Sequence, residues 1–226
     1  MERRSSGASG QRHARQEHEL ERTDASNPWP QQITFFQGGV ASGLVITNNL
    51  AEISNCPGIA LGDGTGGGGT HGAIVANNTI VNNGANETCP QSGEVGALVS
   101  NNQWVNNVIA GKFYQGCDGS VWENNVQIPA RSGGKPIDEI SAICVDGKIA
   151  YEAKPGAYNG VTIYTTDLAT FAFNSYDPPA TGLSTTINLR PVTTGPLYGA
   201  GRVTAGVPTV NIEGKPRIPP VNIGAY

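Results

Sequence analysis

Residues 73–83, AIVANNTIVNN, and 97–107, ALVSNNQWVNN, contain the pattern that decides the fold. In each stretch a short apolar run ends in an Asn pair, and a second apolar run ends in a second pair. The related blocks LVITNN (44–49) and SVWENN (120–125) carry one pair each. The pairs that begin at Asn48, Asn77, Asn101 and Asn124 are 29, 24 and 23 residues apart. Self-similarity at this period is typical of a stacked repeat architecture.

The repeat predicts short strands separated by bends. Each apolar run is short and partly β-branched, which favours a strand over a helix. Asn tolerates the left-handed backbone region, so each Asn pair predicts a sharp bend. A chain that bends the same way in every repeat winds into a coil, and its strands pair in parallel with those of the next coil about 4.8 Å away. Equivalent Asn side chains would then hydrogen-bond from coil to coil.

We therefore expect an all-β fold, a single-stranded right-handed parallel β-helix, which is a solenoid. A leucine-rich repeat would need a leucine ladder and a hexapeptide solenoid a strict six-residue period, and the chain has neither. Residues 33–150 are predicted to form the coils, and residues 151–226 the final coil and a C-terminal closing segment. The Pro-rich tail ends in Val221–Tyr226, which is expected to cover the last coil.

The first 32 residues are a polar stretch of alternating charge, and this composition predicts a disordered tail. No apolar segment follows Arg3 and Arg4, so the chain contains no recognisable signal peptide, and no run is long enough to span a membrane. The segment from Ile33 to Val40 is expected to form a partial coil. Because no capping helix precedes it, one hypothesis is that this chain is the C-terminal part of a longer β-helix.

Charge and cysteine content limit the possible partners. The net charge is −4, which disfavours non-specific nucleic-acid binding but is compatible with a neutral or weakly charged glycan. No C-x-x-C pair occurs, so no metal site is predicted. The cysteines either form one or two disulfides in an exported protein or remain free thiols. They are Cys56, Cys89, Cys117 and Cys144.

The coils resemble those of bacterial right-handed parallel β-helix proteins of the pectate-lyase-like group. The C-terminus is similar to the final segment of such proteins, which runs Asp-x-x-Gly-x-x-Arg and then Asp-Ile-Gly-Ala-Tyr-Glu. Here 211–217 reads NIEGKPR and 222–226 reads NIGAY, with Asn in place of both Asp residues. The resemblance covers roughly residues 40–226. It implies an extracellular or cell-surface location and a polysaccharide partner, but it does not define a reaction, because one fold hosts many functions.

A lyase of this group would need a basic residue to abstract a proton, and Ca²⁺ held by several carboxylates. Lys112 or Arg131 is the candidate base, with Asp118 beside them, and the 19-residue spacing of the two basic residues suggests adjacent coils. Tyr114, Trp104 and Trp122 are the candidate sugar-binding residues. Each of these residues also fits an ordinary role on the surface or in the fold. His71 is interpreted as a loop histidine, because no Gly-x-Ser-x-Gly elbow accompanies it.

Two classes of function remain. The sequence favours an extracellular or surface module that contacts polysaccharide without catalysis and needs no cofactor, because its carboxylates are sparse and form no cluster beyond the adjacent pair Asp138-Glu139. The alternative is a lyase or glycoside hydrolase acting on uronate-containing glycan, with Ca²⁺ if it is a lyase. Convergence of Lys112, Tyr114, Asp118 and Arg131 in one groove would favour the enzyme.

Overall fold

The computed structural model describes residues 33–35, 40–53, 59–62, 69–82, 92–95, 99–111, 113–128, 130–132, 135–137, 141–152, 156–164, 172–175 and 188–226. The polar tail, residues 1–32, lies outside this part of the chain.

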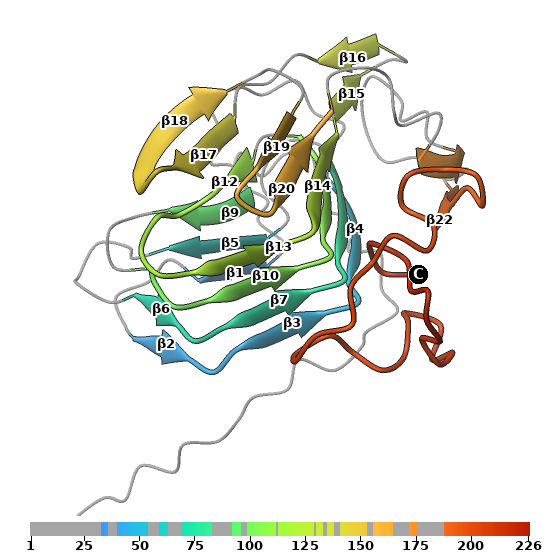
Figure 1. Cartoon of the computed structure of the whole chain (residues 1–226), viewed down its shortest axis with the longest axis horizontal. Helices are drawn as coiled ribbons and strands as arrows, with labels where there is room; N and C mark the ends of the chain where they lie inside the picture. Colours follow the sequence, from blue (N-terminus) through green and yellow to red (C-terminus); the bar gives the residue numbers. More distant parts are fainter. Residues whose placement is uncertain are drawn as a thin grey trace, which may run out of the picture.

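The chain forms the right-handed parallel β-helix that the sequence predicts, with three stacked sheets (Figure 1). Sheet 1 contains, in sequence order, β3 (Val45–Thr47), β7 (Ile74–Ala76), β10 (Gln103–Val105) and β13 (Val121–Glu123). Sheet 2 contains β4 (Leu50–Ile53), β8 (Thr79–Asn82), β11 (Val108–Ala110), β14 (Asn125–Ile128), β19 (Gly156–Tyr158) and β20 (Val161–Ile163). Sheet 3 contains β1 (Ile33–Phe35), β5 (Ile59–Gly62), β9 (Ser92–Val95), β12 (Phe113–Tyr114), β17 (Ser141–Val145) and β18 (Lys148–Glu152).

Each coil passes through sheet 1, then sheet 2, then sheet 3. A short parallel ladder of β2 (Ala41–Ser42) and β6 (Thr70–His71) leads into sheet 1 on the first two coils. Two antiparallel hairpins lie outside the coils. They are β15 (Ala130–Ser132) with β16 (Lys135–Ile137), and β21 (Phe173–Ser175) with β22 (Asn188–Pro191).

The interior of the coils is apolar and continuous. The middle residue of each sheet 1 strand points inward, which places Ile46, Val75, Trp104 and Trp122 in one buried column. The rings of Trp104 and Trp122 stack with their centroids 5.0 Å apart and an interplanar angle of 14°. Because side chains alternate between the two faces of a strand, the flanking residues of sheet 1 face outward.

The predicted Asn ladder is present at the corner where sheet 1 passes into sheet 2. Its members are Asn49, Asn78, Asn107 and Asn125, and each of the first three donates Nδ2 to Oδ1 of the next at 2.8–2.9 Å. The same Oδ1 atoms accept the main-chain N–H of the preceding Asn at 2.9–3.1 Å. The ladder therefore supplies hydrogen bonds that buried main-chain groups require where the strands end.

The register of the third coil differs from the prediction. The sequence spacing aligns Asn101 with Asn77. In the structure β10 pairs with β7 so that Asn106 aligns with Asn77, and Asn107 aligns with Asn78. The offsets along the ladder are therefore 29, 29 and 18 residues. Asn101 lies at the corner between sheets 3 and 1, where its φ of 57° matches the positive φ of Gly43, Gly72 and Gly119. A left-handed corner accepts Gly or Asn, so an Asn pair alone does not distinguish the two corners.

A second apolar core lies outside the coils, on the outer face of sheet 2. Buried side chains of this face pack in one cluster with residues from the C-terminal region: Val81, Val108, Ala110, Val126 and Ile128 from the sheet, with Ala172, Phe173, Leu189, Leu197 and Ile223. Figure 1 shows the C-terminal region beside β4, along the side of the stack. The β21–β22 hairpin, Ala172 before it, and residues 197–226, called the C-terminal strap below, therefore close this face of the β-helix together.

The strap also covers the outer row of Asn residues at the corner between sheets 1 and 2. Asn48, Asn77, Asn106 and Asn124 have φ between 54° and 58°. Their Nδ2 atoms donate to main-chain oxygens of the strap, namely those of Val210, Asn222, Gly224, Arg202 and Ala200. Val221–Tyr226, which the sequence predicts to cover the last coil, contacts earlier coils, since Gly224 donates to the Asn106 carbonyl on the third coil and Ala225 to Thr79 Oγ1 on the second.

Arg217 holds the strap against the first coil. Its guanidinium donates to Asn48 Oδ1 at 2.9 Å and to main-chain oxygens of the strap at 2.9–3.3 Å, those of Val210, Gly224, Ala225 and Tyr226. Burial lowers the pKa of Arg217 to about 10. The fork of donors on a guanidinium suits such a convergence of acceptors, which an ammonium group does not match.

A disulfide between Cys117 and Cys144 joins the turn after β12 to β17 in the next coil, with the Cα atoms 5.3 Å apart. The structure therefore confirms the disulfide alternative for this pair. Cys56 and Cys89 lie outside the described residues.

Candidate functional site

The exposed corner between sheets 3 and 1 lies at the end of sheet 1 away from the strap (Figure 1). Its left-handed positions are Gly43, Gly72, Asn101 and Gly119. On two coils the residue before this position faces outward because the residue before that, Thr70 or Val99, is buried. On the other two coils the residue before the left-handed position is itself exposed. One outward residue per coil therefore stands at this corner: Ser42, His71, Ser100 and Asp118. These four residues are called the corner column.

The members of the corner column are in register and accessible to solvent. Ser42 pairs with His71, His71 pairs with Ser100, and the Asn101 N–H donates to the Asp118 carbonyl of the next coil. Ser42 and Asp118 are exposed, and His71 and Ser100 are partly exposed. His71 Nδ1 and Ser100 Oγ are 2.9 Å apart, and Asn101 Nδ2 donates to the same Ser100 oxygen at 3.3 Å. The column therefore presents hydroxyl, imidazole and carboxylate groups at intervals of about 4.8 Å.

Sheet 1 continues this surface with outward side chains. The first residues of its strands, Val45, Ile74, Gln103 and Val121, are in register. Gln103 is exposed, and Val121 is 48% exposed. The strap reaches this face at Gly206, where a Cβ would meet Ile74 Cγ2 at 3.0 Å and Gln103 Oε1 at 3.5 Å, so one side of Gln103 lies beside the strap. The open surface thus consists of the corner column together with the adjoining Gln103 and Val121.

A buried carboxyl group lies inside the coil behind this corner. Glu94 is 1% exposed, and its Oε1 accepts hydrogen bonds from Asn102 Nδ2 at 2.9 Å, Trp104 Nε1 at 3.0 Å and Ser120 Oγ at 2.9 Å. Within the described part of the chain, its Oε2 has no hydrogen-bond partner. Burial raises the pKa of Glu94, the three donors lower it, and the nearby Asp118 charge raises it further, with a net rise. Glu94 therefore connects the inner side of the corner to the tryptophan stack.

Three of the four residues predicted as an enzyme site are described, and they lie on different elements of the fold. Tyr114 is on β12 in sheet 3, Asp118 is in the corner column, and Arg131 is on the β15–β16 hairpin, which Figure 1 shows apart from β12. Tyr114 pairs with Ala142, an offset of 28 residues, so the 19-residue spacing does not place Arg131 directly above Lys112. Lys112 itself lies outside the described residues.

Trp104 and Trp122, which the sequence suggests as sugar-binding residues, point into the coil. Trp104 has 0% and Trp122 5% exposed surface. Both occupy the middle of a three-residue strand, and this position faces inward in sheet 1. The rings therefore fill the interior of the third and fourth coils.

Sequence reasoning missed Ser42, Ser100 and Glu94 as site residues. A signal for the first two is present in the sequence, as a polar residue before each left-handed position: Ser42-Gly43, His71-Gly72, Ser100-Asn101 and Asp118-Gly119. The successive offsets are again 29, 29 and 18 residues, the same as along the Asn ladder. Glu94 has no comparable signal, because an isolated Glu in a strand is usually exposed.

Within the described residues, no group of three or more His, Cys, Asp or Glu side chains is placed to hold a metal ion. The same part of the chain contains no helix with the length and apolarity needed to cross a membrane.

Comparison with protein-family models, with curated proteins and with solved structures found no match to this chain. The class that the fold defines is the parallel β-solenoid with buried Asn ladders.

Proposed function

We propose that this chain is a polysaccharide-contacting β-helix module of the pectate-lyase-like group, acting outside the cell or at its surface. The binding surface is the corner column with Gln103 and Val121. The observation that carries the proposal is the register of Ser42, His71, Ser100 and Asp118, one polar side chain per coil along an exposed edge.

The chemistry of this surface suits a linear glycan. A polysaccharide chain offers hydroxyl groups at regular intervals, and hydroxyl, imidazole and carboxylate groups can each exchange hydrogen bonds with them. Val121, exposed beside Gln103, provides an apolar contact for the C–H face of a sugar ring. A site with a few polar groups beside an apolar contact is the ordinary arrangement for ligand recognition.

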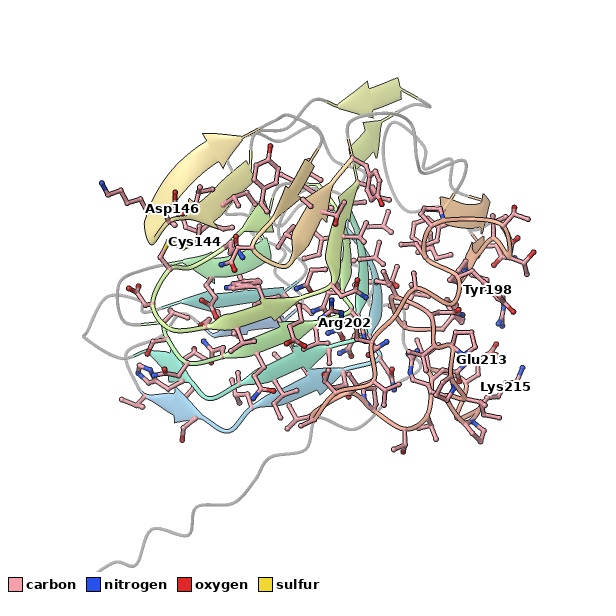
Figure 2. The ribbon with its side chains drawn as sticks, viewed as in Figure 1. Cys144, Asp146, Tyr198, Arg202, Glu213 and Lys215 are labelled. Atoms are coloured by element: carbon pink, nitrogen blue, oxygen red, sulfur yellow. A yellow bond between two sulfur atoms is a disulfide. The ribbon has the colours of Figure 1, made fainter. Side chains whose placement is uncertain are left out.

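The position of the strap supports this choice of surface. The outer face of sheet 2 is packed against apolar side chains of the C-terminal region, and the Asn row at the next corner is hydrogen-bonded to the strap. In Figure 2 Tyr198, Glu213 and Lys215 lie together on the strap side, away from β2 and β6. The corner column is at the opposite end of sheet 1, where it remains accessible.

Two further observations support the assignment to an exported β-helix protein. The disulfide between Cys117 and Cys144 fits an oxidising compartment. The two C-terminal segments that resemble the pectate-lyase-like group, residues 211–217 and 222–226, meet through Arg217, whose guanidinium donates to the main-chain oxygens of Gly224, Ala225 and Tyr226.

The proposal is tested by affinity electrophoresis of the full chain through gels that contain neutral or uronate-rich polysaccharides. We expect at least one polysaccharide to retard the protein. The double substitution Gln103→Ala/Asp118→Ala should weaken this retardation about tenfold, because it removes polar contacts on two coils. Lys215→Ala, an exposed change on the strap side, is the control and should leave retardation unchanged. Equal retardation of the parent and both variants would refute the proposed surface, and so would a failure of every polysaccharide to retard the parent protein.

A further inference from the structure

The corner column contains a pair of side chains with the geometry of a nucleophile and its base. Ser100 Oγ and His71 Nδ1 are 2.9 Å apart, within the range expected between a catalytic hydroxyl and a general base. Both residues are partly exposed, and both are fixed by paired main chains at a left-handed corner. A substrate can therefore approach the pair from solvent.

We infer that Ser100 is an activated nucleophile with His71 as its general base, and that the pair hydrolyses acyl esters. In the tautomer with its proton on Nε2, His71 accepts the Ser100 hydroxyl hydrogen bond at Nδ1. The Asn101 side chain, which donates to Ser100 Oγ at 3.3 Å, is a polar donor beside the attacking oxygen.

The reaction proceeds in two balanced halves. Ser100 Oγ forms a bond to the acyl carbon while its proton passes to His71 Nδ1. The bond from the acyl carbon to the alkoxide then breaks, and the leaving oxygen takes that proton to depart as an alcohol. A water molecule then attacks the acyl-enzyme: its oxygen bonds to the acyl carbon while one of its protons passes to His71 Nδ1. The bond from the acyl carbon to Ser100 Oγ breaks, Ser100 Oγ takes that proton back from His71, and the carboxylic acid is released.

The ester that fits this site is an O-acyl group on a polysaccharide, and this part of the inference rests on the proposed function. The assignment of Ser100 as nucleophile and His71 as base does not rest on the proposed function, because it follows from the contact between Ser100 Oγ and His71 Nδ1. A small activated ester therefore tests the chemistry independently of glycan binding.

The first experiment treats the folded full chain with a fluorophosphonate reagent and with p-nitrophenyl acetate. We expect mass spectrometry to locate the phosphonyl group on Ser100. Ester hydrolysis should be lost in Ser100→Ala and fall about a hundredfold in His71→Ala, which is the usual size of a general-base contribution. Lys215→Ala should match the parent, and circular dichroism melts confirm that each variant is folded.

Labelling of another residue, labelling only after denaturation, or an unchanged rate in His71→Ala would overturn the inference. A second experiment measures acetate release from O-acetylated polysaccharide. Acetate release that depends on Ser100 supports the glycan ester as substrate. Hydrolysis of p-nitrophenyl acetate without acetate release overturns that substrate class and leaves the nucleophile. Failure of both assays while gels still retard the protein overturns the activity and leaves the proposed binding function intact.

Discussion

Replacing Asn107 with alanine should strongly destabilise the β-helix, because Asn107 is the central member of the inner ladder. Its Oδ1 accepts from Asn78 N and Asn78 Nδ2, and its Nδ2 donates to Val75 O and Asn125 Oδ1, all within 3.0 Å. Asn78 is 0% and Asn107 1% exposed, so water does not replace these contacts. The substitution leaves the Asn78 main-chain N–H without the acceptor that it has in the ladder.

The magnitude follows from those contacts. A buried donor left unsatisfied costs roughly 1–3 kcal/mol, and each additional hydrogen bond lost costs about 1 kcal/mol. Because neighbouring contributions are not strictly additive, we expect Asn107→Ala to lower the free energy of unfolding by about 4 kcal/mol. For a chain of this size that corresponds to a fall in Tm of roughly 8–16 °C.

The assay is urea unfolding followed by tryptophan fluorescence, which reports on the buried stack of Trp104 and Trp122. The matched control is Asn101→Gly on the same coil. Asn101 is exposed and has a φ of 57°, a conformation that glycine adopts readily, so this change should stay within about 0.5 kcal/mol. Equal midpoints for the two variants, or a loss below about 1 kcal/mol in Asn107→Ala, would refute the ladder as a source of stability.

Three further predictions concern the interior and the strap. Because the pKa of Glu94 is raised in the folded state, its contribution is fully present below its unfolded pKa, near 4.5, and is lost as pH rises through the folded pKa. Glu94→Gln should flatten this decline of the urea midpoint as pH rises above 4.5, and parallel curves for the two proteins would contradict it. Replacing Cys117 and Cys144 together with alanine should cost about 3.5 kcal/mol by loop-closure entropy over the separation of 27 residues, and an unchanged urea midpoint would argue against this account. Arg217→Met should speed proteolysis within the strap at least tenfold. Arg217→Lys should be cleaved as fast, because an ammonium cannot serve the same acceptors as the guanidinium. A lysine variant that resists proteolysis as well as the parent would contradict this prediction.

The architecture was predictable from the sequence because every coil repeats the same local pattern, a short strand followed by a bend. Each sheet 1 strand is short and apolar, and each is followed by Asn residues that meet both the backbone and the side-chain needs of a bend. The exact register was not predictable, because Asn101 and Asn106 both satisfy a left-handed corner and differ only in which corner they occupy. Strand pairing across coils resolves that ambiguity, and pairing is a property of the assembled fold.

The candidate site was less accessible to sequence reasoning. His71 was visible as an isolated histidine, but its partner Ser100 is 29 residues away and becomes a neighbour only through the coil offset. Trp104 and Trp122 are of the residue type that binds sugars, yet their position in the strand directs them into the core. The docking of the strap was also not predictable from the sequence, since Arg217 hydrogen-bonds Asn48, which is 169 residues away in the chain.

The central claim, that the corner column contacts a linear glycan, is tested most directly by titrating the protein calorimetrically with oligosaccharides of increasing length from the polysaccharide that retards it. The column crosses three coil-to-coil steps, roughly 14 Å. Affinity is predicted to rise with oligosaccharide length until the ligand spans that distance and then to level off, with a weaker rise in Gln103→Ala/Asp118→Ala. An affinity that does not depend on length, or an identical length profile in the double variant, would contradict the account.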